Sequence, residues 1–287
     1  MKVGLSLPQR PQDGPADWPG IRGLARLAED GGADSLWVAD HFLDRRPDEE
    51  SGLHEPFGLL TAVAAVTSRV ELGPLVAATS FRSPGLLAKV AATLDLVAEG
   101  RLTLGVGCGW HEPEYQAFGY PFDHRVGRFE ESIRVIRALL DGERVTFHGR
   151  WVTADDAVLL PAPTRRIALL IAAEGPRMLR LAARHADAWQ AAWPQGSSFD
   201  EALDRLAAAC ELEDRATMPE VFIDIEVGGE PGAFYVPPEP AAIEDALAGW
   251  AERGVAHVQV GTWPAGPESW EPVLEGIRRF RAAAGPG

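Results

Sequence analysis

The sequence predicts an α/β protein: a single (β/α)8 TIM barrel domain over residues 1–287 with a small surface insertion at about 145–165. Eight short apolar segments alternate with eight helical patterns, which is the order that produces a parallel sheet covered by helices. No linker or change of composition separates two halves. A closed barrel is therefore favoured over a doubly wound sheet with an added domain.

The predicted strands are short apolar runs that end in polar or functional residues. They cover 3–7, 35–40, 70–78, 101–109, 167–173, 187–193, 221–227 and 256–261. The predicted helices have apolar residues on one face and are bounded by capping residues, prolines and glycines. They cover 17–30, 56–67, 83–100, 124–140, 175–185, 199–212, 239–254 and 269–284.

Three elements have the strongest local signals. Ser83 and Pro84 supply an N-cap and a first-turn proline, and Gly100 ends that helix. The 124–140 segment repeats apolar residues at spacings of three and four, which makes it the clearest amphipathic helix. Two β-like pieces around 148–149 interrupt the alternation, so we expect a hairpin on the barrel surface.

Composition and charge restrict the partners. The chain is 46% apolar and 24% charged, as in globular proteins. A formal net charge of −15 disfavours nucleic acid and anionic membranes, so we expect a small-molecule substrate. The two cysteines match no disulfide or metal spacing, and neither a signal peptide nor a membrane span is recognisable. We therefore expect a cytoplasmic protein.

In a barrel, the carboxyl ends of all strands meet on one face, where active sites lie. The polar and aromatic residues that follow the predicted strands should converge there. They are Asp40, His41, Thr79, Ser80, Cys108, Trp110, Glu174, Trp193, Glu226 and Trp263.

His41 is the candidate catalytic residue, because it follows a buried strand and its intrinsic pKa suits proton transfer. A metal site is not expected. The histidines and carboxylates that could form one have none of the recognised ligand spacings. These residues are His41, His54, His111, Glu112 and Glu114.

Two glycine-containing segments suggest contact with a ligand. Gly105, Gly107 and Gly109 do not form a dinucleotide fingerprint; they either allow close packing in the barrel or let a flat ring approach the backbone. The 173–177 segment is a strand-to-helix turn whose free N–H groups could receive a phosphate, although Glu174 would repel one. An ordinary helix start is the alternative.

Aromatic residues and Cys108 have simpler interpretations. Trp110, Trp193 and Trp263 follow strands and are plausible walls for an organic substrate. The remaining tryptophans that we singled out as structural are Trp37, Trp151 and Trp250. Cys108 is interpreted as structural, because no neighbour in the sequence lowers its pKa.

Several motifs together resemble the bacterial luciferase-like superfamily, and most closely its deazaflavin-dependent branch. They span 39–42, 99–110, 114–119 with Arg125 and Glu130, and 175–187. The resemblance covers essentially the whole chain and implies a barrel that binds coenzyme F420, or alternatively FMN, for hydride transfer or monooxygenation. It also implies a homodimer.

The resemblance assigns roles to individual residues. It places His41 over the reactive ring and Leu75 and Val76 in a third-strand bulge behind the ring, often with a non-proline cis peptide. The other implied cofactor-binding residues are Asp40, Cys108, Gly109, Ala173, Glu174, Gly175, Pro176 and Arg177.

Two residues depart from the family pattern. Glu174 stands where the phosphate turn commonly has a glycine. Trp110 stands where sugar-phosphate dehydrogenases of this branch have a catalytic glutamate, which argues against a sugar-phosphate substrate. An FMN-dependent monooxygenase and a flavin-binding barrel without catalysis remain alternatives, and a metal-dependent hydrolase is a distant third.

Overall fold

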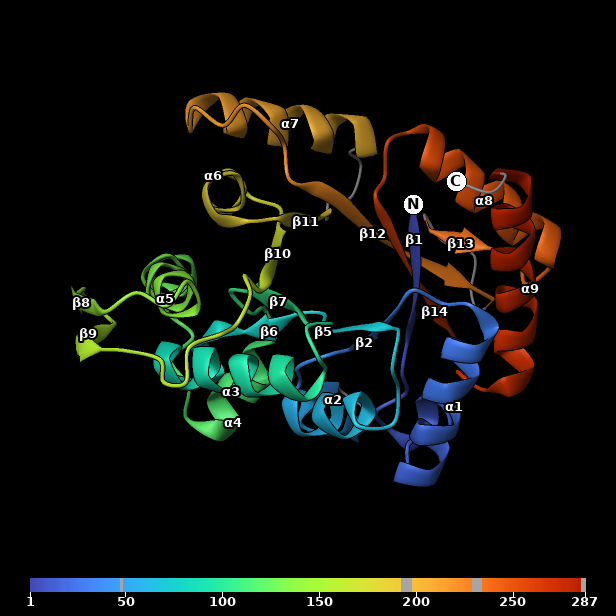
Figure 1. The fold of residues 1–287 in the computed structure, drawn as a ribbon, viewed down its shortest axis with the longest axis horizontal. Coiled ribbons are helices and arrows are strands. Elements are labelled where there is room, and N and C mark those ends of the chain that lie inside the picture. Colours follow the sequence, from blue (N-terminus) through green and yellow to red (C-terminus); the bar gives the residue numbers. More distant parts are fainter. Residues whose placement is uncertain (47–48, 192–197, 229–233, 285–287) are drawn as a thin grey trace.

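The computed structural model describes residues 1–46, 49–191, 198–228 and 234–284. Within these ranges, nine parallel strands form a barrel in the order β5-β2-β1-β14-β12-β11-β10-β7-β6 (Figure 1). The strands are β1 (Lys2–Ser6), β2 (Ser35–Val38), β5 (Glu71–Pro74), β6 (Ala77–Ala78), β7 (Thr103–Gly107), β10 (Ala168–Ala173), β11 (Ala188–Ala191), β12 (Glu220–Val227) and β14 (His257–Thr262).

The barrel closes between the third and fourth predicted strands. The third strand is divided into β5 and β6, which flank Leu75 and Val76. The backbone N–H of Leu72 in β5 donates to the carbonyl of Arg101 at 2.9 Å, and β6 pairs with β7 beyond the interruption. β1 lies between β2 and β14, so the two ends of the chain complete the same sheet. The predicted α/β barrel is thus confirmed.

The helices surround these strands (Figure 1). They are α1 (Trp18–Gly31), α2 (Pro56–Ala64), α3 (Pro84–Val97), α4 (Glu112–Phe118), α5 (Arg125–Leu140), α6 (Pro176–His185), α7 (Phe199–Leu212), α8 (Pro240–Glu252) and α9 (Pro267–Ala284). Asp17 and Ser83 accept N–H bonds at the starts of α1 and α3, and Ser198 forms a capping box with Glu201 at the start of α7.

The predicted surface hairpin is β8 (Val145–His148) paired antiparallel with β9 (Thr153–Ala157). Glu131 of α5 fixes it by accepting the N–H groups of residues 150–152. Trp151 packs here as a structural residue, because a Cβ added at Gly127 would come within 2.6 Å of its ring.

The structure adds elements that the periodicity did not predict. They are α4, a second hairpin of β3 (Asp44–Arg46) and β4 (Glu49–Ser51), β13 (Tyr235–Val236) beside β12, and two 3-10 turns, η1 (Pro11–Asp13) and η2 (Thr79–Phe81). The helix predicted at 56–67 ends at Ala64, and His124 precedes α5 with a positive φ of 51°.

The barrel interior has a packed lower layer and a polar upper layer. Trp37, Leu170 and Phe222 pack together at the amino-terminal end, where Ser35 bonds both the Trp37 indole N–H (2.8 Å) and His257 (2.7 Å). Gln190, Asp224 and Gln259 stand further along their strands and line the cavities at the opposite end. This packed layer also lines a cavity of about 410 Å³ at the amino-terminal ends of the strands, so it lies between that cavity and the ones at the carboxyl ends.

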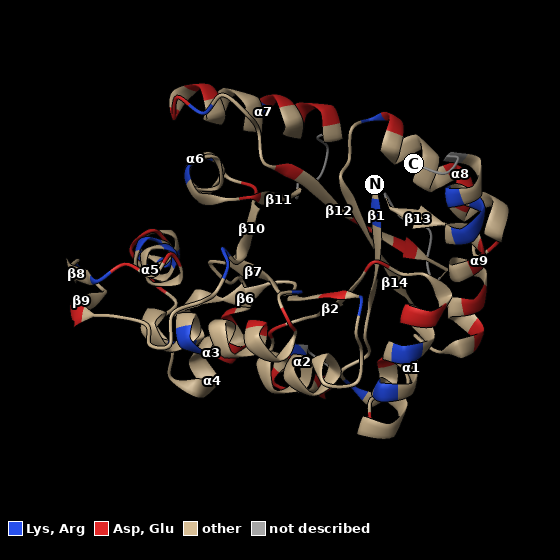
Figure 2. Ribbon diagram, viewed as in Figure 1, with Lys and Arg blue, Asp and Glu red and all other residues tan. Residues whose placement is uncertain are grey.

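Acidic residues are spread over the outer helices, notably along α7 and α9 (Figure 2). No helix within the described ranges is both long and apolar enough to cross a bilayer.

Candidate active site

A cavity of about 560 Å³ opens at the carboxyl ends of β2, β5, β6, β7, β10 and β11. We call it the large cavity. Its size is within the range of cofactor-binding pockets. The predicted site residues that line it are Asp40, His41, Leu75, Val76, Cys108, Gly109, Trp110, Ala173, Glu174 and Gly175.

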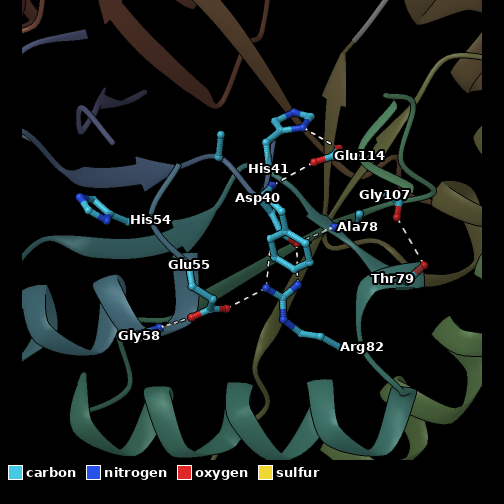
Figure 3. Close-up of polar contacts among 12 residues, drawn as sticks. Asp40, His41, His54, Glu55, Gly58, Ala78, Thr79, Arg82, Gly107 and Glu114 are labelled. Carbon is cyan, nitrogen blue, oxygen red and sulfur yellow. Dashed lines mark hydrogen bonds and ion pairs between the residues drawn. The ribbon is translucent and has the colours of Figure 1, made fainter. Parts of the chain in front are cut away.

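His41 is oriented by a buried carboxylate. Its Nδ1 lies 2.8 Å from Oε1 of Glu114, a residue of α4 whose side chain is only 1% exposed (Figure 3). The other oxygen, Oε2, accepts the backbone N–H of Phe42 at 2.9 Å, so the carboxylate fixes both the histidine and its loop. With Nδ1 engaged, Nε2 is the ring nitrogen left for chemistry in the large cavity.

Asp40 forms the structural centre of the adjacent turn (Figure 3). Its oxygens accept two N–H bonds from Arg82, at 2.7 and 3.0 Å, and one from the backbone of Ala78 at 3.0 Å. Arg82 also bonds Glu55 at 2.7 Å. Because these bonds join the end of β2 to β6, Asp40 positions the wall of the cavity as well as lining it.

The wall contains a cis peptide bond between Leu75 and Val76, at the bulge position that the family resemblance implied. A Cβ at Gly107 would come within 2.9 Å of Val76, and one at Gly105 within 2.1 Å of the Pro74 carbonyl oxygen. These glycines therefore make room for the bulge itself. At Gly109, where φ is 75°, a Cβ would come within 1.7 Å of the Tyr115 hydroxyl.

Buried Tyr115 and half-buried Cys108 are in contact beside this segment. The Tyr115 hydroxyl donates to the Cys108 carbonyl at 3.3 Å, and burial raises the pKa of Tyr115 to about 12. Burial also raises the pKa of the Cys108 thiol, against the opposing charge of Arg125.

Arg125, at the first turn of α5, brings a positive charge to the large cavity. Its Nη1 donates to the Phe122 carbonyl at 3.2 Å and its guanidinium lies 3.7 Å from the centre of that ring. Its Nε is buried and has no hydrogen-bond partner among the described residues. The Cys108 thiol interacts with this guanidinium, which opposes the effect of burial on the pKa of the thiol. A ligand in the cavity could supply an oxygen acceptor to Nε.

The amino-terminus of α6 lies at the cavity edge. Gly175 is its N-cap, with open space where a Cβ would be, and no side chain caps the helix. Glu174 is exposed beside it. Arg177 is not among the residues lining the cavity; it pairs with Glu130 at 2.6 Å. Its charge is therefore largely committed to Glu130 and offsets Glu174 only weakly.

The tryptophans expected to form a substrate wall do not all share one cavity. Trp110 lines the large cavity, is 68% exposed and lies edge-on to His41 with ring centres 5.5 Å apart. Trp263 is 48% exposed and lines a second cavity. Trp193 lies outside the described residues.

The second cavity, of about 220 Å³, opens at the carboxyl ends of β1, β12 and β14. We call it the acidic cavity, because Asp13, Asp224 and Glu226 line it together with Gln259 and Trp263. Thr79 and Ser80 line a third hollow, at the start of α3. The expectation of one convergent pocket is thus wrong in part: the nine of these strand-end residues that the structure describes are divided among neighbouring hollows.

The histidines considered as metal ligands have other partners. His54 bonds the Ala16 carbonyl, and His111 accepts the backbone N–H of Arg45. Within the described ranges, no three His, Cys, Asp or Glu residues are arranged to hold a metal ion.

Sequence reasoning gave no individual role to Glu114, Arg125 or Asp224. Alternation along β12 could have found Asp224, because Phe222, Asp224 and Glu226 fall on one face and Ile223 and Ile225 on the other. Glu114 is 73 residues away from His41, so only the fold could join them.

The fold is a parallel α/β barrel, and its large cavity lies at the carboxyl ends of the strands. In that cavity a histidine is held by a buried carboxylate beside a bulged third strand, an arrangement typical of an enzyme active site. The chain belongs to the luciferase-like monooxygenase family, whose model matches residues 1–281.

Two curated relatives are named F420-dependent glucose-6-phosphate dehydrogenase. The protein from Beutenbergia cavernae is 37% identical over 214 residues, which is 71% of this chain and 62% of the relative. The protein from Amycolatopsis mediterranei is 34% identical over 235 residues, 79% of this chain and 68% of the relative. The matches thus span roughly two thirds of the length of these relatives.

Solved structures agree in fold. An F420-dependent secondary alcohol dehydrogenase in complex with an F420-acetone adduct has a TM-score of 0.81 at 19% identity, covering 98% of this chain and 99% of that one. The coenzyme F420 dependent tetrahydromethanopterin reductase from Methanopyrus kandleri has a TM-score of 0.78 at 21% identity, with 98% and 99% covered.

Proposed function

We propose that this chain is an oxidoreductase that uses coenzyme F420, with FMN as the alternative cofactor, and acts on a small organic substrate. The observation that carries the proposal is the His41–Glu114 pair at a cavity of about 560 Å³ bounded by the Leu75–Val76 bulge. Family membership and the names of the curated relatives support F420 as the cofactor.

The residues of the large cavity fit such a cofactor. Leu75 and Val76 offer an apolar wall to a flat ring, and the buried Nε of Arg125 lacks an acceptor that an anionic group would supply. The uncapped N–H groups at the start of α6 would hold the phosphate that both cofactors carry. In this proposal, Asp40, Cys108, Gly109 and 173–175 complete the binding site, and Pro176 begins the helix whose N–H groups face it. Arg177, which pairs with Glu130, is not part of it.

Glu174 weakens the phosphate site without abolishing it. Two unit charges about 4 Å apart near a protein surface repel by roughly 4 kcal/mol. Glu174 is exposed, so its side chain can turn into solvent, where water screens its charge.

When bound, the cofactor accepts or donates the hydride. His41 holds or moves the accompanying proton at Nε2, while Glu114 fixes the orientation of the ring through Nδ1. Trp110 covers the same space with an aromatic wall. Because Trp110 stands where sugar-phosphate dehydrogenases of this family have a catalytic glutamate, the proposed substrate is not a sugar phosphate.

The proposal includes the organisation of the protein. We propose a single domain over 1–287 that forms a homodimer in the cytoplasm, in keeping with the family resemblance. Light scattering at several concentrations tests the dimer, and a fluorescent fusion tests the location.

Titration of the purified protein with F420 and with FMN, followed by tryptophan fluorescence, tests the cofactor. We expect F420 to bind more tightly. His41→Ala should abolish turnover with either cofactor while leaving the binding of F420 intact. His124→Asn, at an exposed position with positive φ, is the matched histidine control. Failure of both cofactors to bind would refute the proposal, and binding without any turnover would favour a non-catalytic barrel.

A further inference from the structure

The acidic cavity and the large cavity both open at the carboxyl ends of the strands, but on different parts of the barrel. β12, β14 and the end of β1 surround the acidic cavity, whereas the proposed cofactor residues come from β2 to β10 and the start of α6. Gln190 of β11 lines the large cavity, and its side-chain amide donates to Oδ2 of Asp224, which lines the acidic one. This hydrogen bond therefore links a residue of one cavity to a residue of the other.

Asp224 is incompletely satisfied. Its Oδ2 accepts the bond from Gln190, but its buried Oδ1 has no hydrogen-bond partner among the described residues. A buried carboxylate oxygen without a donor is costly and calls for an explanation. A ligand that brings a donor into the acidic cavity supplies one.

The charges around this cavity favour a cation. No lysine or arginine is among the described residues that line it. Asp13 is paired with Arg10 at 2.6 Å, and Arg10 also bonds Asp44 at 2.8 Å, so this arginine is shared between two carboxylates. Glu226 adds a further carboxylate on the same strand face as Asp224. An anionic head group would meet net negative charge here.

We propose that the acidic cavity is the substrate subsite and that it binds an organic amine in its protonated form, with the ammonium group bonded to Asp224 and Glu226. Trp263 lies at the edge of the cavity, with the Arg10 guanidinium 5.4 Å from the centre of its ring, and the exposed remainder of the indole offers an apolar surface to the carbon skeleton of the amine. This inference rests on the proposed function, because the amine would lie next to the cofactor cavity.

Three probes with the same ring and different head groups test the subsite: cyclohexylammonium, cyclohexanol and cyclohexanecarboxylate. Each is titrated calorimetrically into the full-length protein, with and without saturating F420. We expect the ammonium probe to bind more tightly than the alcohol and the carboxylate not to bind measurably. Asp224→Asn should weaken the ammonium probe about 30-fold or more, because a buried charge loses its partner, and leave the alcohol within about threefold.

Glu226→Gln is the second variant and should weaken the same probe by a smaller factor. Asp30→Asn, at an exposed position in α1, is the control and should change neither probe. Equal binding of the three probes, or an unchanged ammonium affinity in Asp224→Asn, would overturn the amine subsite. If ammonium binding persists while F420 does not bind, the cofactor proposal fails and the subsite stands.

Discussion

Asp224 should lower the stability of the ligand-free protein at neutral pH. Burial raises the pKa of this carboxyl to about 6 from its ordinary 3.8, with Glu226 adding to the rise and the bond from Gln190 opposing it. Between these two pH values the folded state binds more protons than the unfolded state, so stability falls as pH increases. Above pH 6 the carboxylate is ionised in both states, and the full loss of unfolding free energy remains.

The size of the effect follows from the two pKa values. The two pKa values differ by about two units, which lowers the free energy of unfolding by about 3 kcal/mol at pH 8 and by about half of that at pH 5. Asp224→Asn removes the ionisation and should therefore stabilise the ligand-free protein by up to that amount at pH 8. At about 2 °C per kcal/mol, the midpoint of thermal unfolding should rise by roughly 5 °C.

The assay is urea unfolding of wild type, Asp224→Asn and the surface control Asp30→Asn at pH 5 and pH 8. The gain of Asp224→Asn should be larger at pH 8, and the control should stay within about 0.5 kcal/mol of wild type. Destabilisation by Asp224→Asn at both pH values would show that the carboxylate is a structural group, and the reasoning would be refuted. A stabilised variant with weakened amine binding is the combination expected of a functional group.

The other predictions concern two histidines and Gly109. Glu114→Gln should reduce kcat about 30-fold, because it removes a charge-assisted hydrogen bond worth about 2 kcal/mol. It should also shift the pH profile of kcat while the affinity for F420 stays constant. Glu112, exposed on the same helix, is the control: an equal effect of Glu112→Gln would contradict a positioning role for Glu114. Burial lowers the pKa of His257 to about 3, so below about pH 6.5 the unfolded state takes up the proton and stability falls by up to about 1.4 kcal/mol per pH unit. Unfolding free energies of His257→Gln between pH 6.5 and 4.5 should lack this slope, and curves parallel to wild type would disprove it. Gly109→Ala should lower the free energy of unfolding in urea by about 2 kcal/mol or more, because the added Cβ clashes with Tyr115. Gly119 has a similar φ of 74° but open space around it, so Gly119→Ala measures the backbone cost alone. Equal losses of unfolding free energy in the two variants would rule out the clash.

The barrel could be predicted because strand and helix periodicities are local. Ser83-Pro84 and Gly100 mark the boundaries of α3 within a few residues, and the 124–140 pattern gives α5 almost directly. By contrast, α4 has seven residues, too few for its periodicity to stand out, and the β3–β4 hairpin has three-residue strands.

The site was predictable only in part, because a strand-end position gives the face of the barrel but not the neighbour. His41 and Trp110 were expected on one face and lie 5.5 Å apart by ring centres. Glu226 and Trp263 share that face but open into the acidic cavity, since β12 and β14 lie on the opposite side of the barrel from β7. The partnership of Glu114 with His41 depends on the packing of α4, which no local pattern reports.

The crystal structure of the protein with F420 bound tests the central claim most directly. We predict that the deazaflavin ring lies in the large cavity against Leu75 and Val76, with His41 beside it and the phosphate at the start of α6. A ring bound elsewhere, or no binding of F420 under conditions where the protein is folded, would contradict the account.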